Sequence, residues 1–447
     1  MSTLIKNGLI VNEGCSQKGT IIINDEGRID AIGGKKIIQE SHFDHVIDAA
    51  GCYVLPGVID EHVHFREPGM TEKATIRSES RAAACGGVTS YMEMPNTIPT
   101  TTTLEAWADK RQRGQKDSAI NYAFYIGATN NNAETLRCAD WKHTPAIKLF
   151  MGSSTGNMLV DRGEALKAVF NLSAELGIPV VSHCEEATLI SENLRLAKLK
   201  YGDDPAVEHH PEIRSEEACV HSTRLAIQLA TDAGAKLHVA HISTAKELEM
   251  IAAHAGQGIT AEAVIAHLLF TDTDYSTLGT RIKCNPAVKS AHDREALLKG
   301  LSSGKILTIA TDHAPHLPTQ KQGGCVKAAS GMPMVQFSLV AMLSLVDAGW
   351  ITIEQLVQLM AHHPAEYFQV KERGFLRKGY HADIVIVKPN TPWTLENSLI
   401  QSPCGWSPLE GQRFNWQVQQ TLCNGHLVYD RGHFDENYRG EELEFDR

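Results

Sequence analysis

Two histidines and an arginine lie near residue 60 in a pattern that suits metal-assisted hydrolysis of a small anion. His62, His64 and Arg66 follow the apolar run 53–59, which predicts a buried strand. Side chains two residues apart on a strand point to the same side, so His62 and His64 can bind one metal ion. Arg66 continues on that face with a planar cation that suits a carboxylate. About one His-x-His pair is expected by chance among 21 His in 447 residues, so the pattern matters only if further ligands lie nearby.

The segments that would position these residues alternate between strand-like and helical patterns. Apolar runs typical of strands occupy residues 54–62, 89–94, 121–126, 146–150, 179–183, 237–241, 259–270 and 306–311. Amphipathic stretches such as 163–176, 218–234, 244–255 and 291–301 indicate helices between them. Eight strands that alternate with helices predict an α/β fold built on a (β/α)8 TIM-like barrel.

Short strands and turns mark both ends of the chain. They lie at residues 4–11, 20–24 and 28–32, and again at 382–387 and 421–429. We expect the two ends to pair into a small β-sandwich domain. Residues 1–54 would form its first part, 55–378 the barrel, and 379–447 its second part and a C-terminal tail. The acidic stretch 435–444 of this tail is expected to be solvated rather than functional.

Further candidate ligands fall where the predicted strands end, which is where active sites lie in such barrels. His183, His241 and Asp312 each occupy such a position. A lone buried histidine is more often a hydrogen-bonded core residue, but the shared placement of four histidines favours a metal centre. A carboxylate that ends a buried strand needs a partner, and a metal ion is one. His238 lies three residues before His241, so we expect it on the opposite face of that strand with a structural role, and we expect His313 to point away from the metal.

Lys148 lies inside the apolar run 146–150, where a bare ammonium is costly. Burial favours the neutral amine, which can react with carbon dioxide to give a carbamate. A carbamate has two anionic oxygens and can bridge two metal ions. The alternative from composition alone is a lysine whose ammonium reaches solvent at the barrel rim.

Seven short segments together match a known family, and the similarity spans nearly the whole chain. They are residues 62–69 (HVHFREPG), 94–97 (MPNT), 147–150 (IKLF), 183–185 (HCE), 239–243 (VAHIS), 312–316 (DHAPH) and 405–411 (GWSPLEG). The chain resembles the cyclic amidohydrolases, a family of metal-dependent barrel enzymes, and within them the dihydroorotases. The Arg-Glu-Pro-Gly and Pro-Asn-Thr elements are specific to that family, whereas His-x-His alone is not.

The resemblance implies reversible hydrolysis of L-dihydroorotate to N-carbamoyl-L-aspartate, a step of de novo pyrimidine biosynthesis. It implies two zinc ions per subunit, bridged by carboxylated Lys148 and a hydroxide that attacks the ring amide. One ion would be held by His62, His64, Lys148 and Asp312, and the other by Lys148, His183 and His241. Asp312 would also carry the proton to the leaving nitrogen. The implied substrate-binding residues are Arg66, Asn96 and His316 at the carboxylate and Asn285 at the ring edge, with residues 152–157 as a lid.

Two alternatives remain. Hydantoinases and allantoinases share the metal ligands, but they lack an arginine at the position of Arg66. A non-catalytic barrel scaffold is a second alternative, against which the full set of expected ligands weighs. Lys148 resembles the lysine type of bridging ligand rather than the aspartate of some bacterial dihydroorotases. One departure is Ala266-His267, where many relatives carry two histidines.

Bulk properties favour a cytoplasmic enzyme that acts on a small molecule. A net charge of −11 gives no support to nucleic-acid binding. The sequence shows no signal peptide and no apolar run of membrane-spanning length. None of the ten cysteines forms a CxxC pair, which is typical of reduced thiols. We expect a homodimer.

Overall fold

The barrel expected from the sequence is present, and its parallel strands close into a ring. The computed structural model describes residues 2–33, 40–152 and 158–447. Within them, the barrel has eight strand positions, one of which β8 and β9 share. The strands are β6 (Val58–Val63), β7 (Val88–Glu93), β8 (Asn121–Phe124), β9 (Ile126–Gly127), β10 (Ile147–Phe150), β11 (Val180–His183), β12 (Leu237–Val239), β13 (Ile259–Val264) and β14 (Thr308–Ala310). A hydrogen bond of 2.7 Å from His64 N to His313 O links the first position to the last.

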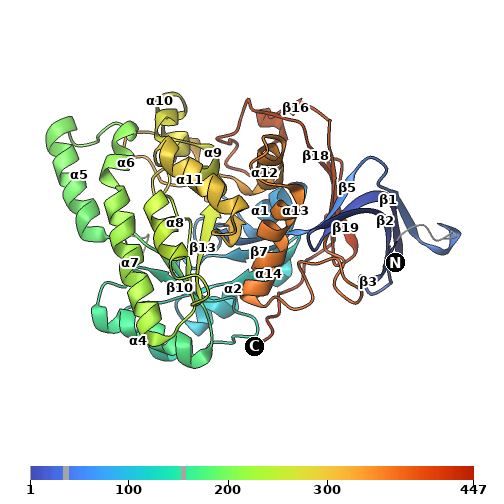
Figure 1. Cartoon of the computed structure of the whole chain (residues 1–447), viewed down its shortest axis with the longest axis horizontal. Coiled ribbons are helices and arrows are strands. Elements are labelled where there is room, and N and C mark those ends of the chain that lie inside the picture. Colours follow the sequence, from blue (N-terminus) through green and yellow to red (C-terminus); the bar gives the residue numbers. More distant parts are fainter. Residues whose placement is uncertain (1, 34–39, 153–157) are drawn as a thin grey trace.

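Helices cover the outside of the barrel (Figure 1). Those before the last barrel strand are α1 (Ile76–Cys85), α2 (Leu104–Asp117), α3 (Ala133–Arg137), α4 (Gly163–Leu176), α5 (Ala187–Tyr201), α6 (His210–Ile213), α7 (Glu216–Ala233), α8 (Ala245–Ala252), α9 (Ile265–Leu269), α10 (Tyr275–Leu278) and α11 (Ala291–Ser302). After it come α12 (Ser338–Asp347), α13 (Ile353–Val357) and α14 (His363–Phe368). Local sequence sets their ends. Thr75 and Ser215 accept hydrogen bonds from the first turns of α1 and α7, and Gly234 ends α7 in the left-handed region.

The barrel strands are buried on both faces, which explains their continuous apolar runs. Ile59 and Val181 belong to one cluster inside the barrel. Their strand neighbours Val58 and Val180 belong to a larger cluster shared with the surrounding helices. Adjacent side chains therefore enter different cores, as the two-residue period of a strand requires.

The two ends of the chain pair as expected, in a separate nine-stranded sheet at the right of Figure 1. Its strands are β1 (Thr3–Asn12), β2 (Cys15–Ile23), β3 (Ile29–Gly33), β4 (His45–Asp48), β5 (Tyr53–Pro56), β15 (Ile384–Lys388), β18 (Gln417–Cys423), β19 (His426–Asp430) and β20 (His433–Phe434). N-terminal β5 lies between N-terminal β1 and C-terminal β15, which joins the two ends. A two-stranded sheet pairs β16 (Trp393–Thr394) with β17 (Arg413–Phe414). The domain boundaries after residues 54 and 378 stay a prediction.

Two expected strands differ from the observed ones. The run 54–62 is divided at Gly57, whose N–H donates to Asp383 O at 2.9 Å, so that β5 joins the terminal sheet and β6 the barrel. A Cβ on Gly57 would lie 2.1 Å from the Thr89 hydroxyl, which explains the glycine at this junction. The run 259–270 ends as a strand at Val264 and continues as helix α9, because apolar runs alone do not separate strand from helix.

The acidic tail is packed rather than fully solvated. Leu443 and Phe445 are buried in the cluster that also contains Ile59 and Val181. Glu441 pairs with Arg373 at 2.9 Å, and Glu442 pairs with Arg111. Apolar and charged residues alternate in the tail. These apolar side chains are therefore buried, and these carboxylates pair with arginines. Among the described residues, no helix combines the length and apolarity needed to cross a membrane.

Candidate active site

A cavity of about 550 Å³ opens where the barrel strands end. It is lined by nine of the ten residues expected at the site: His62, His64, Arg66, Asn96, His183, His241, Asn285, Asp312 and His316. Helix α5 adds an apolar wall that includes Ile190 and Leu194. The tenth residue, Lys148, is fully buried on β10, the strand that precedes β11 and its His183. The structure thus gathers side chains from strands that are far apart in the sequence.

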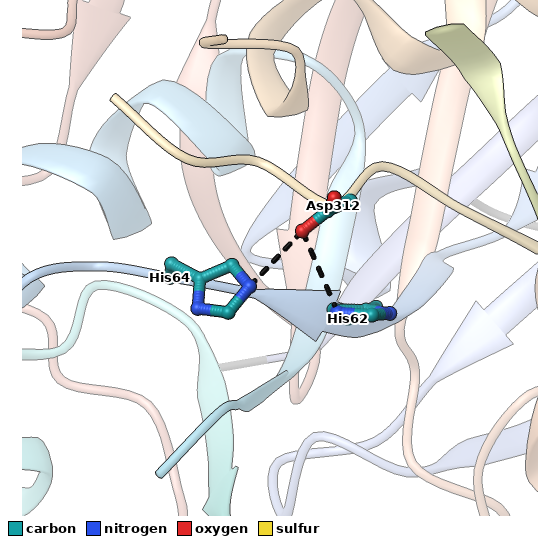
Figure 2. Close-up of side chains that lie close together, drawn as sticks. All are labelled: His62, His64 and Asp312. Atoms are coloured by element: carbon teal, nitrogen blue, oxygen red, sulfur yellow. Dashed lines mark hydrogen bonds and ion pairs between the residues drawn. The ribbon is translucent and has the colours of Figure 1, made fainter. Parts of the chain in front are cut away.

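His62, His64 and Asp312 form the first group of possible metal ligands. Figure 2 shows one carboxylate oxygen of Asp312 directed at both imidazoles, which come from β6 and the residue after it. Asp312 Oδ1 lies 3.0 Å from His64 Nε2 and 3.5 Å from His62 Nε2. Asp312 adopts a left-handed φ of 48°, which turns its side chain out of the strand direction and into the cavity. Burial would raise the pKa of Asp312, but the nearby His62 and His64 outweigh it and hold the pKa well below its usual range.

His183 and His241 form the second group. His183 Nδ1 lies 2.9 Å from His241 Nε2, so two ring nitrogens face each other and at most one carries a proton. The other nitrogen of His183, Nε2, donates to Glu185 Oε2 at 2.8 Å, and Arg214 pairs with the same carboxylate. Glu185 therefore leaves the His183 Nδ1 lone pair directed at His241. Such a pair of facing lone pairs suits a shared cation.

Lys148 is the buried amine that the sequence predicted. The alternative, a lysine whose ammonium reaches solvent at the barrel rim, is excluded. Its side chain is fully buried, and Nζ has no hydrogen-bond partner among the described residues. Burial lowers the pKa of Lys148 to about 8 despite the nearby carboxylates of Glu262 and Asp312. An unpaired buried amine is unfavourable, and conversion to a carbamate that binds cations would relieve it. The donor set of imidazoles, carboxylate and buried amine therefore fits a pair of divalent ions.

Two residues orient the histidines of β6, and the sequence had indicated neither role. Glu262 on β13 lies 2.9 Å from His62 Nδ1 and accepts a hydrogen bond from His241 N at 2.8 Å. Asn96 Oδ1 accepts from His64 Nδ1 at 2.6 Å. These acceptors hold the proton on Nδ1 of each ring and free Nε2 toward Asp312. One sequence signal could have indicated this role of Glu262: it is a charged residue inside the apolar run 259–264.

Arg66 and His316 lie together on one wall of the cavity. Arg66 adopts a φ of 70°, and its Nε donates to Pro315 O at 3.0 Å. A second guanidinium nitrogen of Arg66 lies 3.0 Å from His316 Nε2, which also lies 3.0 Å from Ser330 O. Burial lowers the pKa of Arg66 to about 10, so the guanidinium stays charged at neutral pH. Because no carboxylate of the described residues pairs with Arg66, the wall presents a buried positive charge to the cavity.

Asn285 lies on the cavity wall beside a histidine that the sequence analysis did not single out. Its Oδ1 is 3.1 Å from Nε2 of His210, which also lies 2.9 Å from Cys284 O. His210 is buried on α6 and also lines the cavity. Burial lowers the pKa of His210 to about 3, so the ring is neutral. Sequence spacing gave no signal for His210, because it lies in the excursion between β11 and α7.

Two other histidines, His313 and His238, have structural surroundings. His313 faces away from the cavity as expected, and its Nε2 donates to Glu79 at 2.7 Å. The expectation that His238 faces the opposite side from His241 is wrong, because its ring nitrogen lies within 4.8 Å of Glu61 and Glu262 oxygens in the barrel interior. β12 ends at Val239 and His241 has a φ of 38°, so the two-residue period stops between them. His238 still has a structural role, since both its nitrogens contact threonine hydroxyls.

Two further expectations concern His267 and the lid at residues 152–157. His267 lies on α9, where its Nε2 bonds Pro286 O at 3.1 Å, and it does not line the described cavity. The proposed lid at residues 152–157 lies outside the described residues except for Gly152. A Cβ on Gly152 would lie 2.2 Å from Glu185 O, so a close backbone approach explains this glycine.

Comparisons with known proteins show the family to which the chain belongs. The amidohydrolase family matches residues 53–428. Dihydroorotase from Lactiplantibacillus plantarum is 34% identical over 436 residues, with 96% of this chain and 99% of that protein covered. Dihydroorotase from Halobacterium salinarum is 34% identical over 407 residues, with 91% and 92% covered. Among solved structures, L-hydantoinase from Arthrobacter aurescens has a TM-score of 0.91 at 27% identity, with 97% of each chain covered. The chain belongs to the amidohydrolase family, and it is similar in sequence to the dihydroorotases of that family.

Proposed function

We propose that the protein is a dihydroorotase that interconverts L-dihydroorotate and N-carbamoyl-L-aspartate. The observation that carries the proposal is the buried guanidinium of Arg66 in the wall of a cavity that also holds His62, His64, His183, His241 and Asp312. The substrate is a cyclic amide with one carboxylate, and the cavity offers a cation for the carboxylate beside ligands for hydrolytic metal ions. Relatives named dihydroorotase at 34% identity support the same assignment.

Two zinc ions bridged by carboxylated Lys148 would complete the centre. His62, His64 and Asp312 would hold one ion, and His183 and His241 the other. Imidazole and carboxylate donors suit zinc, and the buried, unpaired Lys148 Nζ supports the proposed carbamate. When bound, the ions polarise the amide carbonyl and make water more acidic.

The remaining steps are carried by side chains. Arg66 would bind the substrate carboxylate through two parallel hydrogen bonds, with Asn96 and His316 beside it. Asn285 would bind the edge of the ring. Asp312 would accept a proton from the attacking water on Oδ2, since Oδ1 faces the histidines, and pass it to the leaving ring nitrogen. The cavity wall of α5 and Ile213 would limit access of bulk water.

A hydantoinase is the second candidate, because the solved L-hydantoinase shares the fold at a TM-score of 0.91. Hydantoins lack a carboxylate, so they would leave the Arg66 guanidinium unpaired in the cavity. The two functions are distinguished by comparing kcat/KM for L-dihydroorotate with that for hydantoin on the same metal-loaded preparation. A preference for dihydroorotate of 100-fold or more is expected, and equal turnover would contradict the proposal.

The biological setting follows from the proposed reaction. The step belongs to de novo pyrimidine biosynthesis, and we place it in the cytoplasm as a homodimeric enzyme. The relatives named dihydroorotase support the pathway. The ten free cysteines agree with a reducing compartment. Sedimentation of the metal-loaded enzyme tests the dimer, and a single species of monomer mass would contradict it.

A further inference from the structure

Two buried lysines hold a short loop against the cavity wall that carries His316. The loop consists of residues 328–331, all of which line the cavity. Lys321 Nζ donates to three backbone oxygens, those of Ala329 at 2.7 Å, Gly331 at 2.8 Å and Lys283 at 3.2 Å. Lys283 Nζ in turn donates to Ala328 O. The two ammonium groups thus bind the loop at both of its ends.

The arrangement suits a charged amine. An ammonium has three N–H donors, which match the three carbonyl acceptors around Lys321, whereas a neutral amine has only two. Burial and the neighbouring Lys283 ammonium lower the pKa of Lys321 to about 7, whereas hydrogen bonds to carbonyl oxygens stabilise the protonated form. In the described part of the chain, neither Lys321 nor Lys283 forms an ion pair. A buried ammonium without a paired carboxylate destabilises the fold. The buried lysines are therefore not explained by packing alone, which points to a role in the adjacent cavity.

The loop is in direct contact with His316. Ser330 O lies 3.0 Å from His316 Nε2, the atom that also faces Arg66. Gly331 has a φ of 131°, and a Cβ there would lie 3.1 Å from His316 Nε2. A shift of the loop by a few tenths of an ångström would therefore displace His316.

Trp406 connects Lys321 to His316 from the other side. The Lys321 ammonium lies 5.7 Å from the centroid of the Trp406 ring, within the range of a cation–π contact. Trp406 Nε1 donates to His316 O at 2.7 Å. Trp406 belongs to the segment 405–411, one of those that match the family, and this segment thus supplies a second support for His316.

We propose that Lys321 is a positioning residue, which clamps the loop 328–331 and the Trp406 side chain so that His316 stays beside Arg66 in the anion-binding wall. The inference rests on the proposed function, because it assigns Lys321 to binding of the substrate carboxylate. Lys321 touches neither the proposed metal ligands nor the reacting atoms. Its loss should therefore weaken substrate binding more than the chemical step.

The test compares Lys321→Met with Lys289→Met. Lys289 is also buried and donates from Nζ to a single backbone oxygen, Ala287 O at 3.0 Å, but it does not line the described cavity. Both variants remove a buried ammonium, so their difference isolates the effect on the loop. We expect KM for L-dihydroorotate to rise at least tenfold in Lys321→Met, with kcat within threefold of wild type and bound metal unchanged. Lys289→Met should keep the wild-type KM.

Equal KM values in the two variants would overturn the inference, as would a fall of kcat in Lys321→Met at constant KM. If Lys321→Met fails to fold, Trp406→Phe decides, because it keeps a smaller aromatic ring near the ammonium and removes the indole N–H that bonds His316 O. A KM at least threefold above wild type in Trp406→Phe would support the inference, and a smaller change would overturn it. The wild type is assayed first: turnover of dihydroorotate upholds the proposed function independently, and its absence rejects that function and the inference with it.

Discussion

Replacement of Arg66 by lysine tests how the cavity selects its substrate. The guanidinium has five N–H donors, of which one binds Pro315 O and one faces His316 Nε2. Three donors remain for a ligand, enough for two parallel hydrogen bonds to a carboxylate. The ammonium introduced by Arg66→Lys would keep the charge but offer only one well-directed hydrogen bond to the carboxylate.

The expected decrease in kcat/KM of Arg66→Lys follows from these contacts. A hydrogen bond to a charged group contributes about 1.5–3 kcal/mol, so the loss of one predicts a fall of about 2 kcal/mol in transition-state binding. This corresponds to a decrease of about 30-fold in kcat/KM. The Pro315 carbonyl loses its donor in both free and bound enzyme, so that cost lowers stability and largely cancels from kcat/KM.

The assay measures ring opening of L-dihydroorotate chromatographically, with metal content determined on the same samples. Dihydrouracil, the same ring without the carboxylate, serves as the control substrate. Arg66→Lys should lower kcat/KM for dihydroorotate about 30-fold and leave metal content and any turnover of dihydrouracil unchanged. Wild-type kinetics on dihydroorotate, or an equal loss on both substrates, would refute the role of Arg66 in carboxylate binding.

Three further substitutions test the metal centre and the proton transfer. Asp312→Asn should lower kcat by a factor on the order of 100 or more, because an amide cannot carry the proton; a variant that keeps its metal and near-normal kcat would disprove this role. Lys148→Ala should lose most bound metal and activity, whereas the same change at Lys167, exposed on α4, should alter stability by only about 0.5 kcal/mol. Adding a short carboxylic acid with divalent metal should restore part of the activity of Lys148→Ala. Glu262→Gln should weaken metal affinity roughly 10- to 100-fold through His62, measured by competition with a chelator, and unchanged affinity would remove Glu262 from the centre.

The sequence predicted the barrel and most of the cavity because both depend on periodic patterns. Apolar runs marked the strands, and the rule that barrel sites form at strand ends brought His183, His241 and Asp312 to one cavity. The pattern failed where the backbone leaves the regular strand. His241 has a positive φ angle, so the two-residue period could not give the side that His238 faces relative to it.

Contacts between distant segments were also beyond the sequence. Glu262 and His62 are 200 residues apart, and Lys321 acts on backbone oxygens, which no side-chain pattern reveals. His210 lies in an excursion outside the strand–helix repeat, where position along the chain does not predict position in space. The division of the run 54–62 between two sheets depended on Gly57 and Asp383, which only the folded chain brings together.

The central claim is a pair of metal ions bridged by a modified Lys148 in a site built for an anionic cyclic amide. A crystal structure of the metal-loaded enzyme, with anomalous diffraction recorded at the zinc absorption edge, tests it most directly. We expect two anomalous peaks among His62, His64, His183, His241 and Asp312, with density for a carboxylate on Lys148 Nζ between them. An unmodified Lys148 beside a single peak, or no peak at all, would contradict the account.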